Sequence, residues 1–154
     1  MIQSQLNKRL TMNLFFNRIN KIRYTALPYQ GKGNDISFGL EYQPWQTLHL
    51  EMSLIYSDFT RTSDAVKEYD YTILRSRNTF QVNKYLFFRG IVEYNSFYKT
   101  LMTDLLASFT YIPGTVIHVG YGSFYERVQW LEGEYRPADR FLEIQRGFFF
   151  KASY

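Results

Sequence analysis

The two histidines, His49 and His118, are the side chains of this 154-residue chain with the most versatile chemistry near neutral pH. Each lies on the polar side of an alternating segment and a few residues from a predicted tight turn, so both are predicted to face one polar surface at a similar height. With a serine and a glutamate, either could act in a lipid-modifying membrane enzyme. Such a trio must face lipid near the outer leaflet, whereas these histidines are predicted to face inward near the opposite edge. We therefore expect both to be polar lining residues.

The rest of the sequence offers no other catalytic or cofactor chemistry. There is no cysteine, which excludes disulfides and thiolate metal sites. A two-histidine metal site would also require carboxylates at bonding distance. The sequence has no phosphate-binding glycine loop and no nucleophile elbow. We expect no catalytic residue, no metal and no cofactor.

Charged residues at alternate positions form a second candidate set: Glu51, Arg75, Arg77, Arg89 and Glu93. If the turn near residues 82–85 pairs residue 83 with 85, Arg75 lies opposite Glu93 and Arg77 lies opposite Ile91. Opposed charges on neighbouring strands stabilise a sheet by about 0.2–1 kcal/mol each. With the two histidines, these residues are predicted to line a lumen. They would form either a structural charge network or the charged rings that set the selectivity of a solute path.

Trp130 is the candidate for contact outside this surface. It lies among acidic and basic residues in a predicted loop, 127–140. An exposed tryptophan there could contact a sugar or a partner protein, or it could pack the loop onto the rim of the fold. The sequence leaves both interpretations open.

The elements that position these residues are predicted to be β-strands. Apolar side chains recur at every second position, as in Leu48–Tyr56, where they alternate with histidine, glutamate, serine and isoleucine. Period two with abundant Tyr, Phe, Thr and Ile indicates strands, and no segment has a helical period. The alternation is weakest in residues 71–82.

The connections between the predicted strands alternate in length. Tight turns at 7–9, 43–45, 82–84 and 112–114 alternate with longer polar segments at 21–34, 61–68, 99–103 and 127–140. This predicts an all-β, antiparallel up-and-down meander of eight or nine strands. Short turns on one edge and longer loops on the other are typical of outer-membrane barrels. The long predicted strands also suit a bilayer, which a tilted strand crosses in about 9–11 residues.

Composition bears on what the apolar rows face. The chain has 14 Tyr, 14 Phe and 2 Trp, and many of them gather at row ends, like the aromatic girdle of a membrane protein. The polar rows hold little lysine, which suits a lumen better than the outside of a soluble barrel. These features favour a transmembrane β-barrel, or the C-terminal part of one, over a soluble lipocalin-like carrier barrel. The net charge of +4 is dispersed, so we expect no nucleic-acid partner.

The strand count bears on completeness. Eight strands follow Leu10, and residues 1–6 are predicted to be the tail of a ninth, all in one domain spanning 1–154. Because bacterial barrels have even strand numbers, and because MIQSQLNKRL is not a secretory signal, we expect an N-terminal region of the same protein to be missing. The alternative is an independent eight-stranded barrel with a short extension.

Four stretches within residues 36–154 carry a resemblance to a known family: LEYQPWQTLHLEMSLIYSDFTR, TFQVNKYLFFRGIVEYN, LLASFTYIPGTVIHVGYG and GFFFKASY. They are similar to the C-terminal barrel of a family of Gram-negative outer-membrane proteins. Members couple an N-terminal sandwich, similar to family-nine carbohydrate-binding modules, to a barrel of unassigned function. The resemblance implies a barrel in the outer membrane. The sandwich is not in this sequence, so sugar binding is not implied.

Together these features predict an integral outer-membrane β-barrel segment of a Gram-negative bacterium, acting as a passage or membrane anchor without chemistry of its own. Its expected partners are outer-membrane lipid and the barrel-assembly machinery, for which the terminal aromatic Tyr154 is suited. A lipid-modifying barrel enzyme and a soluble lipocalin-like carrier are the alternatives.

Overall fold

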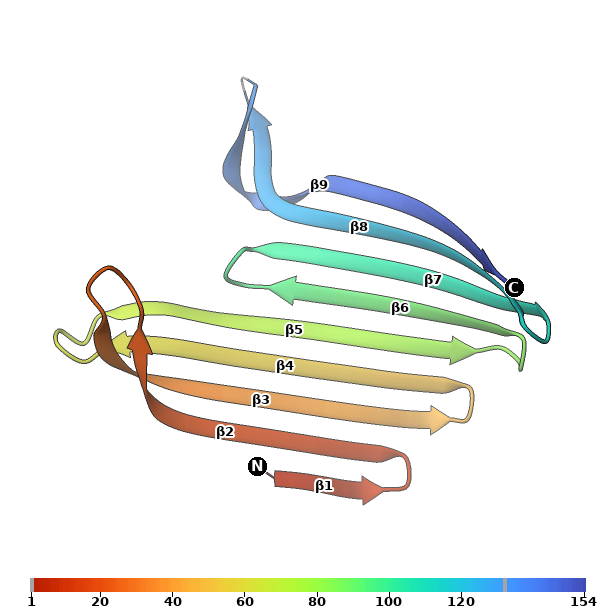
Figure 1. Ribbon diagram of the computed structural model, residues 1–154, viewed down its shortest axis with the longest axis horizontal. Helices are drawn as coiled ribbons and strands as arrows, with labels where there is room; N and C mark the ends of the chain where they lie inside the picture. The colour runs from red at the N-terminus through yellow and green to blue at the C-terminus, as the bar shows by residue number, and fades with distance from the viewer. Residues whose placement is uncertain (1, 132) are drawn as a thin grey trace.

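The computed structural model describes residues 2–131 and 133–154. Met1, in the predicted N-terminal tail, and Glu132, in the predicted loop 127–140, lie outside the described residues. The described residues form one sheet of nine antiparallel strands, and the strands follow one another in chain order across it (Figure 1). This confirms the all-β meander. The described residues contain no helix that is long and apolar enough to cross a membrane.

The strands have the following bounds: β1 Ile2–Asn7, β2 Leu10–Arg23, β3 Tyr29–Trp45, β4 Leu48–Arg61, β5 Lys67–Gln81, β6 Leu86–Asn95, β7 Thr100–Ile112, β8 Thr115–Leu131 and β9 Glu134–Ser153. The N-terminal residues form β1, which pairs with β2 and confirms the predicted ninth strand. β1 and β9 lie at the two edges of the sheet and are not paired with each other within the described residues (Figure 1). The sheet is therefore open.

The longer connections are shorter than predicted because the strands continue into them. β2 and β3 stay paired out to Arg23 and Tyr29, so residues 24–28 connect them instead of 21–34. β8 and β9 stay paired out to Leu131 and Glu134, so the predicted loop 127–140 is largely a hairpin. The connection predicted at 61–68 is reduced to residues 62–66. The one predicted at 99–103 lies at residues 96–99 instead, because β6 ends at Asn95 and β7 begins at Thr100. The prediction of loops was wrong because these strand ends lack a regular apolar row, and period two is the signal that reveals a strand.

The turn predicted at 43–45 lies at residues 46–47 instead. Pro44 belongs to the end of β3, where the pairing with β4 shifts between Tyr42 and Trp45. A proline is tolerated at such an irregularity because its missing N–H breaks no regular ladder bond. Its carbonyl oxygen accepts a hydrogen bond from Arg9 Nη1 at 2.8 Å, which ties two neighbouring turns together.

The register gives the sheet two chemically different faces, because directly paired residues point to the same side. The apolar face carries Leu14, Phe38, Met52, Leu74, Val92, Leu105, Tyr121 and Phe148, one from each of β2–β9. The polar face carries Asn13, Glu41, Glu51, Arg77, Glu93, Asp104, His118 and Lys151 from the same strands. The alternation in the sequence thus becomes a separation in space.

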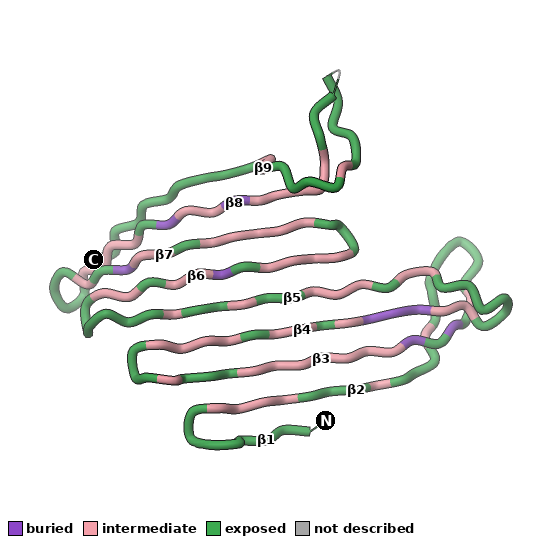
Figure 2. Tube along the Cα trace, turned by 180° about the vertical axis from the view of Figure 1, so that it is seen from behind, coloured by how far each residue is buried: buried purple, intermediate pink, exposed green. Residues whose placement is uncertain are grey.

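The sheet has almost no core of its own. Within the described residues, Phe59 and Ile91 are the only buried hydrophobic side chains, and Figure 2 shows the strands as largely half-buried or exposed. The apolar face is open on every strand from β2 to β9, with Met52 43%, Leu105 53% and Phe148 81% exposed. Because a sheet with one hydrophobic face must bury it against another layer, something beyond the described residues must cover the apolar face.

Two hairpins bend away from the body of the sheet, at the ends of β2–β3 and of β8–β9 (Figure 1). The first bend depends on Gly31 and Gly33: a Cβ at Gly31 would lie 2.4 Å from the Phe59 ring, and one at Gly33 would lie 2.8 Å from the Lys21 side chain. Glycine allows both side chains to pass close to the backbone. Phe59 is consequently only 1% exposed.

Candidate functional site

The predicted lining residues of β4 and β5 meet on the polar face. Arg77 is paired with Glu51, and its Nη2 donates a hydrogen bond of 2.5 Å to Glu51 Oε1. His49 Nε2 lies 3.0 Å from the same oxygen. One carboxylate therefore holds both an arginine and a histidine, which fixes the three side chains in a row along β4 and β5.

A second charge pair lies beside the first. Arg75 is paired with Glu93 and Arg77 with Ile91, which confirms the register expected from the turn between β5 and β6. Arg75 Nη1 lies 3.5 Å from Glu93 Oε2. Arg89 is on the same face, paired with Thr79. All five charged residues singled out in the sequence thus share one face.

This group continues onto two acidic residues that the sequence analysis did not single out. Glu41 on β3 is paired with Glu51, and Asp104 on β7 is paired with Ile91. The sequence could reveal these two residues only through the strand pairing, which can be derived once the adjacent turns are placed correctly. We call the following residues the charged band: Glu41, His49, Glu51, Arg75, Arg77, Arg89, Glu93 and Asp104. Hollows of about 480 and 680 Å³ lie along it.

His118 lies apart from the charged band. It is on β8, paired with Ser108 and Lys151, whereas His49 is on β4. The two histidines share a face. When the pairing is followed from strand to strand, they differ in position by two residues along the strand direction. Across the sheet, however, four strand spacings separate them, about 19 Å in all. The described residues contain no group of three acidic, histidine or cysteine side chains that could hold a metal ion. The structure therefore does not bring the two histidines into one site.

Trp130 lies near the tip of the β8–β9 hairpin, in a strand and not in the predicted loop. Its ring packs edge-on against Tyr135, with 4.7 Å between the ring centroids, and the side chain is 58% exposed. The packing joins the two strands of the bent hairpin. The open part of the ring remains available for contact.

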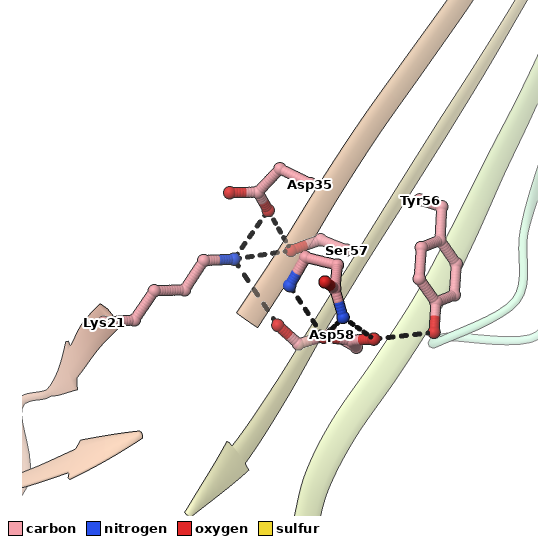
Figure 3. A network of polar contacts seen from close by, with 6 residues as sticks. Lys21, Asp35, Tyr56, Ser57 and Asp58 are labelled. Carbon is pink, nitrogen blue, oxygen red and sulfur yellow. Dashed lines mark hydrogen bonds and ion pairs between the residues drawn. The ribbon is translucent and has the colours of Figure 1, made fainter. Parts of the chain in front are cut away.

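A polar cluster that was not predicted lies where the β2–β3 hairpin bends (Figure 3). On the polar face, Lys21 Nζ lies 2.6 Å from Asp35 Oδ1 and donates to Ser57 Oγ at 3.1 Å. The Ser57 hydroxyl donates to the same Asp35 oxygen at 2.6 Å. The sequence pattern does not predict this cluster, because it places Lys21 in the segment predicted to be a loop, 21–34.

On the other side of β4, Asp58 gathers three donors (Figure 3). Its carboxylate accepts the Asn34 backbone N–H at 2.8 Å, the Asn34 side-chain amide at 3.0 Å and the Tyr56 hydroxyl at 3.0 Å. The cluster therefore anchors the β2–β3 hairpin to β4 through the Asp58 carboxylate.

Comparisons with known proteins add no evidence about the fold or the candidate site. The sequence matches no family model and no curated protein, and no solved structure matches the chain. The family resemblance described above stays a prediction.

Proposed function

We propose that this chain is a membrane-spanning segment of a Gram-negative outer-membrane β-barrel, with its apolar face toward lipid and its polar face lining an aqueous passage. The observation that carries the proposal is the exposed apolar face, which extends over β2–β9 of a sheet that buries almost no hydrophobic side chain of its own. Lipid covers such a face along its whole length. The strand ladders meanwhile satisfy the backbone hydrogen bonds, as a hydrocarbon environment requires.

The dimensions of the apolar rows support the same proposal. At about 3.3 Å per residue and a tilt near 45°, Leu48–Tyr56 rises about 19 Å, close to the roughly 25 Å apolar band of outer-membrane barrels. Trp45, Tyr85 and Tyr111 are exposed near the tight-turn edge. Aromatic rings with a polar atom favour the boundary between lipid and water.

The alternative functions have less support. A lipocalin-like carrier needs an apolar cavity, whereas the two hollows along the charged band lie on the polar face of the sheet. A lipid-modifying enzyme needs an assembled nucleophile and base, whereas Glu51 holds His49 together with Arg77, and His118 lies four strands away.

The charged band would set the ion preference of the passage. We expect Arg77→Glu to shift the preference toward cations, because it replaces a cation with an anion beside Glu41 and Glu51. The measurement is the reversal potential across a planar bilayer, in a salt gradient, of the purified protein and its variant. Lys84→Glu makes the same change of charge in the β5–β6 turn and should shift the potential less.

Two outcomes would count against the passage. A membrane-inserted protein without any ion conductance would show that the segment is an anchor. Equal shifts in Arg77→Glu and Lys84→Glu would show that the charged band does not line the conducting path.

A further inference from the structure

A ladder of aromatic rings crosses the loop end of the polar face. Its successive centroid distances are 6.1 Å for Tyr29–Phe59, 5.8 Å for Phe59–Tyr69, 6.1 Å for Tyr69–Tyr71, 6.4 Å for Tyr71–Phe97 and 5.1 Å for Phe97–Tyr98. The ladder runs from Tyr29 past the enclosed Phe59 to the β6–β7 turn, where Phe97 and Tyr98 are 55% and 71% exposed. The chain thus holds a supported aromatic surface open to water.

A pocket of about 430 Å³ lies against the open end of this ladder. Its aromatic lining comprises Tyr69, Tyr71, Phe97 and Tyr98, and its polar lining comprises Arg23, Glu68 and Asn95. A few convergent polar groups in an otherwise apolar concave site are the usual form of a small-molecule site. The pocket shares none of its lining residues with the charged band.

Each polar group of the pocket is held by a specific local feature. Arg23 reaches across from the bent β2–β3 hairpin and lies 5.4 Å from the Tyr69 ring centroid. Glu68 is the extra residue where the β4–β5 pairing shifts, and such a bulge redirects a side chain. Asn95 Oδ1 accepts the backbone N–H groups of Phe97 and Tyr98 at 3.0 and 3.2 Å. Its Oδ1 is therefore occupied by the turn, while its amide NH₂ group can donate to a ligand.

The charges of the pocket favour an acidic ligand. Glu68 forms its ion pair with Arg61, which also lies 3.1 Å from Asp64, and not with Arg23. Within residues 2–131 and 133–154, no carboxylate lies at ion-pair distance from Arg23. The cation over Tyr69 is therefore available to a negative group on a ligand.

We propose that this pocket binds one ring of an acidic saccharide. A sugar ring has a C–H face that packs on aromatic rings such as Tyr71 and Tyr98, and a rim of hydroxyls that can accept from Asn95. A carboxylate on the ring would receive a bidentate hydrogen bond from Arg23. A wholly apolar ligand would leave Arg23 and Asn95 unsatisfied, and a bare phosphate would leave the aromatic surface unused. The inference goes beyond the proposed passage and depends only on the fold.

The test is isothermal titration of the full chain in detergent micelles with trigalacturonate and with maltotriose. We expect the acidic trisaccharide to bind more tightly than the neutral one. Tyr98→Ala should weaken its binding about tenfold, as removal of a central aromatic contact does. Arg23→Gln should reduce the affinity for trigalacturonate to that for maltotriose. The controls are Tyr111→Ala, at the other end of β7, and Arg18→Gln, an exposed position on the same strand as Arg23.

Because Tyr98 is largely exposed, Tyr98→Ala should retain the fold, which an unchanged melting temperature would verify. No binding of either saccharide by the unaltered chain would overturn the proposal. So would equal losses in Tyr98→Ala and Tyr111→Ala. Equal affinity for the two saccharides, with Arg23→Gln unaffected, would overturn the role of Arg23. None of these results would alter which face of the sheet meets lipid, so failure here is distinguishable from failure of the proposed function.

Discussion

Replacing Phe59 by alanine should lower the free energy of unfolding by about 3–5 kcal/mol, the usual cost of removing a buried phenylalanine ring. Phe59 is the one large side chain that the described residues enclose almost completely. Its ring lies against Gly31 and between the rings of Tyr29 and Tyr69. Alanine would leave a cavity at the bend, because these neighbours belong to β3 and β5, which are both held by pairing with β4, and cannot close over it.

The matched control is Phe97→Ala, which removes the same ring from the exposed β6–β7 turn. It should cost much less, because little of that ring is withdrawn from water. The measurement is urea-induced unfolding of each refolded variant in detergent micelles. Similar losses in the two variants would contradict the idea that the β2–β3 bend is organised around Phe59.

Replacing Met52 by arginine should destabilise the membrane-inserted protein by about 2–4 kcal/mol, the cost of an arginine on the lipid face near the bilayer midplane. Met52 lies on the apolar face, halfway along Leu48–Tyr56, and is 43% exposed. The variant would place a guanidinium where the proposal places hydrocarbon. Folding free energies in lipid vesicles provide the measurement.

Met102→Arg makes the identical change on the opposite face and provides the control. Met102 is paired with Glu93 on the polar face and lines the larger hollow beside the charged band. An arginine there would meet a carboxylate and water, so we expect a change within about 1 kcal/mol, as at an ordinary exposed site. Equal costs for the two arginines, or a greater cost at Met102, would contradict the proposed orientation of the sheet.

The sequence was most informative where one face of a strand is uniformly apolar. The alternation in Leu48–Tyr56 locates β4, and the short turn near residue 84 predicts the pairing of Arg75 with Glu93. Even the weakly alternating residues 71–82 proved to be largely a strand, because the pairing of β4 and β6 on either side supports β5. Short turns and period two together fix the register, and the register gathers the charged band.

The sequence was least informative where the chain leaves the regular sheet. Period two does not reveal the bend at Gly31 and Gly33, because the bend depends on side chains from β2 and β4. The same holds for Asp58, whose donors come from Asn34 on β3 and from Tyr56. The bulge at Glu68 was likewise hidden, since an extra residue in one strand is visible only once its partner is known.

The central claim, that the apolar face meets lipid and the polar face meets water, can be tested at two adjacent residues. The chain contains no cysteine, so Met52→Cys and Ser53→Cys each introduce a single thiol, on opposite faces of β4. Each variant would be inserted into lipid vesicles and treated with a small charged thiol reagent that reacts only in water. We expect rapid modification at residue 53, and protection at residue 52 until the protein is unfolded. Rapid modification at residue 52, with or without modification at residue 53, would contradict the account.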